Sequence, residues 1–182
     1  MPLSFEEYLQ LEREAETKHE FVAGFIYAMA GASETHNRIS GNAFYHLRTA
    51  ARGGPCGVFM ADMKVRIETR DSCYYPDVSV VCDPGDDDAY VKRTPCIIIE
   101  VLSDSTEATD RREKRVAYQT LPSLRYLLVV SSRERRVEYF VRNENEEWEA
   151  AVLGADEQLS LTCDNLDAVL DLDRIYEDVA LG

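Results

Sequence analysis

One carboxylate interrupts a stretch of the chain that otherwise has the composition of a buried β-strand. Residues 96–102 read Cys-Ile-Ile-Ile-Glu-Val-Leu, and their length and β-branched content predict a strand in the core. Glu100 lies inside this run. Removing an unpaired ionised carboxylate from water has a large free-energy cost, so Glu100 requires a proton, a cationic partner or a metal ion. The fold must therefore supply one of these three beside a core strand.

A second carboxylate opens another apolar run. Residues 75–81 read Tyr-Pro-Asp-Val-Ser-Val-Val, so Asp77 begins a predicted strand and shares a face with Ser79. In the later strand, Glu100 shares a face with Ile98. If the two strands are neighbours, Asp77 and Glu100 can converge on one ion, and ligation by oxygen alone suits Mg²⁺ or Mn²⁺. The alternative is that Arg side chains or backbone N–H groups satisfy both carboxylates.

Length and composition indicate one globular domain without a membrane partner. The chain of 182 residues can bury a substantial core, and none of its apolar runs approaches the roughly 20 residues of a membrane-spanning helix. The first residues lack the basic and apolar regions of a signal peptide, so we expect a cytoplasmic protein. The five cysteines are odd in number and show no CxxC or Cys/His spacing. We therefore do not expect a zinc cluster or a disulfide framework, and several of the cysteines lie in strand-like runs as reduced core residues would.

The net charge of −14 is concentrated near the C-terminal end of the chain. Residues 144–182 hold 12 acidic residues against Arg174 alone, which leaves 22 acidic and 19 basic residues in the rest of the chain. Contact with nucleic-acid phosphates requires Lys and Arg side chains, so this distribution weakens the argument against such a partner. Residues 111–115 form the main basic cluster. For each basic cluster, the alternative is a solvated surface without a partner.

The order of the predicted elements indicates an α/β fold with a mixed central β-sheet flanked by helices. Ser4, with Glu7 three residues later, has the pattern of a capping box. We expect one domain over 1–182, with a core over about 1–143 and an acidic segment over 144–182. Predicted helices cover 5–14, 34–51, a segment from Ser105 or Thr106 to Thr120, and 166–170; predicted strands cover 19–22, 25–29, 58–60, 62–68, 74–82, 96–102, 124–130, 136–141 and 148–153.

Several motifs together resemble the PD-(D/E)xK nuclease superfamily, and in particular a large bacterial family of restriction-endonuclease-like proteins. The motifs are residues 19–27, residues 75–81 and residues 100–106, followed by Asp110, Lys114 and Tyr118 at helical spacing. The resemblance extends to about residue 172. It implies a restriction-endonuclease-like fold and a Mg²⁺- or Mn²⁺-dependent endonuclease that hydrolyses DNA phosphodiester bonds. The implied metal ligands are Asp77 and Glu100, with Glu20 as an auxiliary ligand.

The chain departs from the superfamily pattern at one position. The motif lysine ordinarily stands two residues after the glutamate, where this chain has Leu102. The resemblance implies that the lysine has moved to the following helix, where Lys114 is the candidate. Near two carboxylates and a metal ion, an ammonium group can position the attacking water and offset charge in the transition state. The alternative is a solvent-facing pair of Lys114 with Asp110, which contributes little to stability.

Other residues and other functions are weaker candidates. One rival interpretation is a non-catalytic protein that keeps the nuclease fold for binding or assembly. Another is a subunit whose acidic segment pairs with a basic partner protein. A homodimer would suit an enzyme that cuts both strands of a duplex. Arg111, Arg112 and Arg115 are candidates for contact with the DNA backbone, and His36, Tyr118 and Asp62 are auxiliary candidates near the metal.

Overall fold

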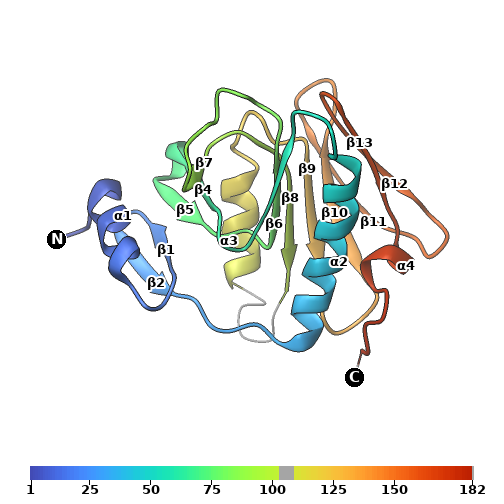
Figure 1. Cartoon of the computed structure of the whole chain (residues 1–182), viewed down its shortest axis with the longest axis horizontal. Coiled ribbons are helices and arrows are strands. Elements are labelled where there is room, and N and C mark those ends of the chain that lie inside the picture. The colour runs from blue at the N-terminus through green and yellow to red at the C-terminus, as the bar shows by residue number, and fades with distance from the viewer. Residues whose placement is uncertain (103–108, 182) are drawn as a thin grey trace.

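The computed structural model describes residues 1–102 and 109–181, and the side chains of residues 109–111 lie outside that description. Helices and strands alternate along the chain (Figure 1). The helices are α1 (Phe5–Glu14), α2 (Glu34–Ala50), α3 (Thr109–Tyr118) and α4 (Leu172–Ile175), with a 3₁₀ turn at Glu68–Arg70. The strands are β1 (His19–Val22), β2 (Phe25–Ala28), β3 (Gly57–Met60), β4 (Lys64–Ile67), β5 (Ser72–Tyr74), β6 (Val78–Val81), β7 (Val91–Lys92), β8 (Pro95–Val101), β9 (Tyr126–Val130), β10 (Val137–Arg142), β11 (Trp148–Val152), β12 (Leu159–Cys163) and β13 (Leu166–Leu170).

A six-stranded mixed sheet forms the centre of the molecule, with the strand order β11-β10-β9-β8-β6-β3. β8 and β9 are parallel, whereas the other neighbouring pairs are antiparallel. Successive residues of β8 point to opposite faces: Ile97 and Ile99 pack in the cluster that contains α2, and Ile98 packs with Tyr118 of α3. Helices therefore cover both faces of this sheet (Figure 1). The predicted α/β fold with a mixed central sheet flanked by helices is confirmed.

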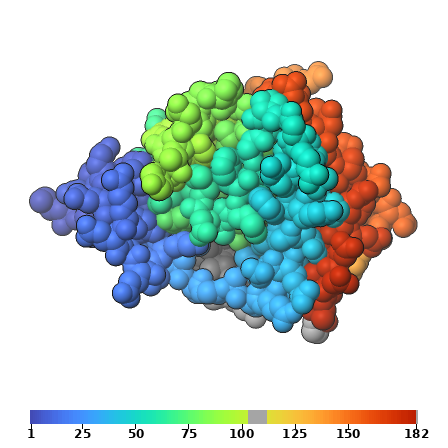
Figure 2. Space-filling view, in the orientation of Figure 1, coloured from blue at the N-terminus to red at the C-terminus, as the bar shows by residue number. Residues whose placement is uncertain are grey.

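A five-stranded sheet, in the order β2-β1-β5-β4-β7, connects the N-terminal part to the rest of the molecule. α1 begins at the predicted capping box, in which the side chains of Ser4 and Glu7 each bond the other's backbone N–H. Tyr8 of α1 packs against Phe21 of β1 in a small apolar cluster. Figure 2 shows this N-terminal part projecting from one side of the molecule, with the C-terminal segments on the opposite side. The hairpin β1–β2 forms where the sequence predicted it.

The C-terminal hairpin corrects one prediction. Residues 166–170, which we expected to form a short helix, form strand β13 and pair antiparallel with β12. Leu166, Ala168 and Leu170 are buried and the two residues between them are exposed, so the period is two rather than 3.6. An apolar run of five residues is too short for periodicity to separate the two possibilities. Its buried side packs in the same cluster as α2, which only the folded chain reveals.

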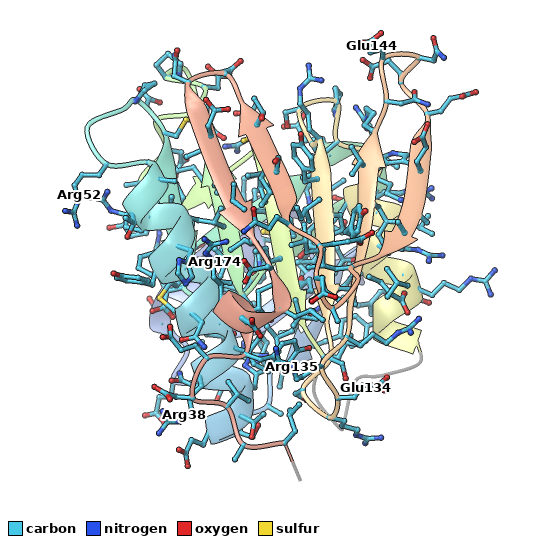
Figure 3. The ribbon with its side chains drawn as sticks, turned by 90° about the vertical axis from the view of Figure 1, so that its right-hand side faces the viewer. Arg38, Arg52, Glu134, Arg135, Glu144 and Arg174 are labelled. Carbon is cyan, nitrogen blue, oxygen red and sulfur yellow. A yellow bond between two sulfur atoms is a disulfide. The ribbon has the colours of Figure 1, made fainter. Side chains whose placement is uncertain are left out.

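Part of the acidic C-terminal segment lies beside basic side chains on the surface. Arg135 pairs with Asp173 of α4, and Arg174 pairs with Asp171, the residue that caps this helix (Figure 3). Exposed ion pairs of this kind contribute at most about 1 kcal/mol each. For Arg135, the structure agrees with the interpretation of a solvated surface.

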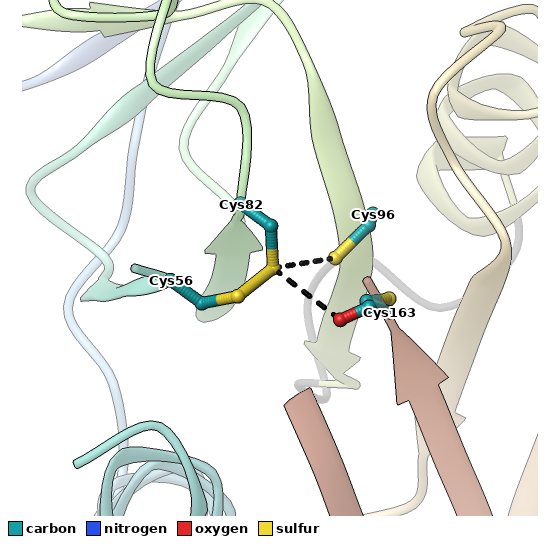
Figure 4. Close-up of a disulfide and its surroundings, with 4 residues drawn as sticks. All are labelled: Cys56, Cys82, Cys96 and Cys163. Atoms are coloured by element: carbon teal, nitrogen blue, oxygen red, sulfur yellow. Dashed lines mark hydrogen bonds between the residues drawn. A yellow bond between two sulfur atoms is a disulfide. The ribbon is translucent and has the colours of Figure 1, made fainter. Parts of the chain in front are cut away.

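One disulfide joins two of the five cysteines, of which we expected several to be reduced. Cys56 immediately precedes β3 and Cys82 immediately follows β6, and these two strands are antiparallel neighbours. Strand pairing therefore brings together two cysteines that are 26 residues apart in the sequence, and the structure joins them (Figure 4). Spacing alone could not reveal this pair because the intervening residues form a separate part of the fold. Cys73, Cys96 and Cys163 are free and buried, as predicted.

Two further expectations concern particular segments. The third helix ends at Tyr118, two residues before the predicted end, and its predicted start at Ser105 or Thr106 lies outside the described residues. Among the helices that the structure describes, none combines the length and the apolar character that a membrane crossing requires.

Candidate functional site

Asp77 and Glu100 come from neighbouring strands of the central sheet. β6 pairs antiparallel with β8, with Val78 opposite Ile99, so Asp77, one residue before β6, comes next to Glu100. The expectation that the two strands are neighbours is confirmed. Oδ2 of Asp77 accepts a 2.7 Å hydrogen bond from the backbone N–H of Val101. A backbone donor thus satisfies one oxygen of Asp77, as the alternative interpretation of these carboxylates expected.

The Glu100 carboxyl group is held by a tyrosine from α3. The hydroxyl of Tyr118 donates a 2.6 Å hydrogen bond to Oε1 of Glu100. Burial raises the pKa of Glu100 to about 8; the charge of Lys114 opposes this rise, and the charge of Asp77 adds to it. At neutral pH, Glu100 therefore retains a proton for much of the time unless an additional cation lies nearby. Of the three means of compensation expected for Glu100, the metal-free protein therefore uses a proton.

Lys114 makes its short ion pair with Glu20. Its Nζ lies 2.6 Å from Oε1 of Glu20, and the exposed fractions of the two side chains are only 14% and 11%. The ammonium group also lies 5.5 Å from the ring centroid of Tyr74, a distance at which cation–π attraction operates. β1 and α3 are far apart in the sequence, so this contact is entirely tertiary. Lys114 lies near enough to Glu100 to lower the pKa of that carboxyl group.

His36 approaches Asp77 from the first turn of α2. Ser33 caps this helix by accepting a hydrogen bond from the backbone N–H of His36, which fixes the start of α2 near the carboxylate. Nε2 of His36 lies 3.3 Å from Oδ1 of Asp77. Burial lowers the pKa of His36, but the hydrogen bond and charge of Asp77, together with a hydrogen bond to the Val101 backbone, outweigh it and leave the pKa raised. The side chain of His36, an auxiliary candidate in the sequence, is therefore largely buried at this site.

One cavity of about 1070 Å³ connects these groups. Residues from β2 and the segment after it, including Tyr27 and Gly31, form part of its wall. Its volume is at the upper end for small-molecule sites, so an extended substrate can reach the carboxylates. Seven of the residues predicted from the sequence line it: Glu20, His36, Asp77, Glu100, Lys114, Arg115 and Tyr118.

Other predicted residues are placed differently. Asp62 is exposed, forms an ion pair with Lys18 and is not among the residues that line the cavity. Arg112 is exposed on α3. Arg115 borders the cavity, with its guanidinium group 5.1 Å from the ring centroid of Phe140. The side chains of Arg111 and Asp110 lie outside the described residues, so the proposed pair of Asp110 with Lys114 does too.

Two contributors to the site escaped the sequence analysis. The ring of Tyr74 lies beside the Lys114 ammonium group, and the backbone of Val101 bonds Asp77. An aromatic residue at the end of a strand is most simply interpreted as core, and a backbone N–H group carries no sequence signal. Only the position of Tyr74, three residues before Asp77, could have drawn attention to it.

The donor set at this site suits a hard divalent cation. Asp77 and Glu100 offer carboxylate oxygens, which Mg²⁺ and Mn²⁺ prefer, and a nearby cation would offset the cost of ionising Glu100. Within residues 1–102 and 109–181, however, no group of three or more His, Cys, Asp or Glu side chains is arranged to hold a metal ion. Two carboxylates with several water ligands fit Mg²⁺, which usually keeps much of its hydration.

Known proteins resemble this chain in both sequence and fold. Two uncharacterized proteins of Synechocystis match it: slr1290 is 37% identical over 98% of this chain and 93% of its own length, and sll1609 is 34% identical over 80% and 84%. A crystal structure described as a putative nuclease belonging to DUF820, from Anabaena variabilis, superimposes with a TM-score of 0.76 at 16% identity. It covers 98% of this chain and 100% of its own, which supports the fold.

The family match covers nearly the whole chain. Residues 5–171 match the model of a family described as "Uma2: Putative restriction endonuclease". This range includes every described side chain that lines the cavity with Asp77 and Glu100. It also agrees with the resemblance to restriction-endonuclease-like proteins that the sequence motifs indicated. The chain therefore belongs to the Uma2 family, within the PD-(D/E)xK-like restriction-endonuclease-like proteins.

Proposed function

We propose that this protein is a divalent-metal-dependent endonuclease that hydrolyses DNA phosphodiester bonds. The observation that carries the proposal is the position of Asp77 and Glu100 on adjacent central strands, in a cavity that also contains the buried pair of Lys114 and Glu20. Family membership supports nuclease activity in general. The choice of Mg²⁺ or Mn²⁺ and of DNA as substrate rests on the oxygen donors and on the family description.

In this proposal, Asp77 and Glu100 would hold the metal ion, which when bound supplies an acidified water and polarises the scissile phosphate. Lys114 would position the attacking water and offset negative charge that develops on the phosphate. Glu20 would hold Lys114 in place through the 2.6 Å contact, rather than serve as a metal ligand. Tyr118 would orient the Glu100 carboxyl group through its hydrogen bond.

The charge of the cavity makes substrate binding dependent on the metal. Among the residues that the structure describes, its lining contains five acidic residues, three basic ones and His36. The acidic residues are Glu16, Glu20, Asp77, Glu100 and Glu113, and the basic ones are Lys18, Lys114 and Arg115. Ionised carboxylates at the site repel phosphates, so DNA would enter this cavity together with divalent cations. Outside it, the exposed Arg112 is available to contact the DNA backbone.

A non-catalytic nuclease-fold protein is the second candidate. Two observations favour it: the short contact of Lys114 is with Glu20, and the described residues contain no group of three side chains arranged for a metal ion. In that case, the buried ion pair would serve to fix α3 against β1. A single domain over 1–182, a cytoplasmic location and a homodimer stay predictions.

A plasmid-nicking assay with Mg²⁺ or Mn²⁺ separates the two candidates. Glu100→Gln keeps the size of the side chain and an acceptor for Tyr118 but removes the ionisable group. We expect it to abolish cleavage, because the metal would lose a charged ligand. Asp62→Asn is the matched control, since Asp62 is an exposed carboxylate that does not line the cavity, and it should cleave like the wild type. Equal cleavage by wild type and Glu100→Gln would reject the metal-dependent mechanism.

A further inference from the structure

Four of the five cysteines converge at one place in the fold, away from the carboxylate site. Cys56 precedes β3, Cys82 follows β6, Cys96 lies in β8 and Cys163 ends β12 (Figure 4). They come from four separate segments, including the C-terminal hairpin. All four are buried in the same core cluster. Neither the family assignment nor the proposed nuclease chemistry accounts for this arrangement.

The sulfur atoms are close enough to react with one another. Cys56 and Cys82 form the disulfide, and Sγ of Cys82 lies 3.8 Å from Sγ of the free Cys96. The thiol of Cys96 is near enough to Cys163 to raise the pKa of its thiol, and the backbone carbonyl of Cys163 lies 3.8 Å from Sγ of Cys82. A disulfide next to two thiols is the arrangement required for thiol–disulfide exchange.

We propose that these four cysteines form a thiol–disulfide exchange site. Through it, the disulfide between Cys56 and Cys82 is replaced by one between Cys96 and Cys163. In the first step, the thiolate of Cys96 attacks Sγ of Cys82. The bond between Cys82 and Cys96 forms, the bond between Cys56 and Cys82 breaks, and Cys56 leaves as a thiolate that takes up the proton released by Cys96. No external oxidant or reductant is consumed, because one disulfide replaces another.

In the second step, the thiolate of Cys163 attacks Sγ of Cys96. The bond between Cys96 and Cys163 forms, and Cys82 leaves as a thiolate that takes up the proton released by Cys163. One disulfide and two thiols are present before and after. The starting disulfide joins two adjacent strand ends within one sheet, whereas the final one joins β8 to β12. The exchange would therefore attach the hairpin covalently to the central sheet.

The environment of Cys163 slows the attack of this thiol on a disulfide. The hydrogen bond with Cys96 and burial both raise the pKa of Cys163. The thiolate is the nucleophile in exchange, so a buried, protonated thiol attacks slowly. We therefore expect the second step to be slower than the first.

Disulfide mapping tests the proposal on the full-length protein. A Cys73→Ala background places each remaining cysteine on its own tryptic peptide, because Cys73 and Cys82 otherwise share one. The protein is incubated without oxidant or reductant, quenched with acid, alkylated and mapped without reduction. We expect peptides that link Cys82 to Cys96, or Cys96 to Cys163, to appear while the number of free thiols stays constant. A link between Cys56 and Cys82 as the sole product at every time would overturn the proposal.

Two variants make the result independent of any single substitution. Cys163→Ser leaves the first step open and blocks the second, so links of Cys82 to Cys56 and to Cys96 should both occur. Cys56→Ser, reoxidised with oxidised glutathione, should form a link of Cys96 to Cys82 or to Cys163. Failure of both variants to form any link through Cys96 would contradict the proposal. Cys96→Ser is the matched control and should retain the disulfide between Cys56 and Cys82 alone.

Discussion

Lys114 Nζ lies 2.6 Å from Glu20 Oε1, so the lysine that we propose as the replacement for the missing motif residue is held by a carboxylate from the N-terminal hairpin. Both side chains are largely buried, and the lysine also contacts the ring of Tyr74. This ion pair connects α3 to β1 at the wall of the cavity. Lys114 can therefore contribute to the stability of the fold, to catalysis or to both, and variants can measure the two contributions separately.

Replacing Lys114 by Met should lower both stability and activity. The substitution removes the buried cation beside the Glu20 carboxylate, which should decrease the free energy of unfolding by about 3 kcal/mol. If Lys114 assists the attacking water, cleavage should fall by about 10²-fold or more. Urea denaturation and plasmid nicking measure the two effects.

The double variant Glu20→Gln/Lys114→Met distinguishes a structural role from a catalytic one. It removes both charges, so most of the lost stability should return, whereas cleavage should stay low. Recovery of cleavage together with stability would show that Lys114 acts only through the fold.

The stability of the metal-free protein should decrease as pH rises from about 4.5 to about 8. The pKa of Glu100 is raised from 4.5 to about 8 in the folded state, so the unfolded chain releases this proton first and is increasingly favoured over that range. The raised pKa of His36 acts in the same direction, because the protonated ring is favoured in the folded state and its contribution is lost as pH rises.

Urea midpoints between pH 4 and 9 in EDTA measure this dependence. Glu100→Gln should flatten the profile without abolishing it, since the contribution of His36 remains. A Glu100→Gln profile with the same slope as the wild type would show that Glu100 is not the titrating group.

Divalent-metal binding should depend on Asp77 and increase with pH. Binding of Mn²⁺ must displace the proton of Glu100, so the affinity measured by calorimetry should rise between pH 6 and pH 8. Asp77→Asn should weaken binding by at least about tenfold, because one charged oxygen ligand is lost. Asp62→Asn should bind like the wild type; weakening by this control would place the ion elsewhere.

Removing the Tyr118 hydroxyl should shift the titration of Glu100. Its hydrogen bond favours the ionised carboxylate, so Tyr118→Phe should raise the pKa of Glu100 further. Above pH 8, where Glu100 is ionised in the wild type, the variant should lose about 1 kcal/mol of unfolding free energy. At pH 5, where Glu100 is protonated in both proteins, the loss should be smaller. An equal loss at both pH values would indicate a packing defect.

Much of the fold and the site was predictable because the signals are local. The capping box at Ser4 predicts the start of α1, and the apolar run around Glu100 predicts β8. The hairpin at β12–β13 was missed because five apolar-rich residues fit either period, and pairing with a neighbouring strand decides between them. The disulfide was missed for a similar reason, since its two cysteines meet only through the pairing of β3 with β6.

For the site, the amino-acid sequence by itself determined which carboxylates lie in apolar, strand-like segments. Asp77 and Glu100 stand in apolar strands, and burial of charge requires compensation wherever such strands pack. Only the tertiary structure decided how that compensation is made. Glu100 faces Tyr118, Asp77 meets His36 and the Val101 backbone, and Lys114 pairs with Glu20. The partners of these side chains come from four segments that are far apart in the sequence. Strand order and helix placement bring the segments together, and both depend on the packing of the whole chain.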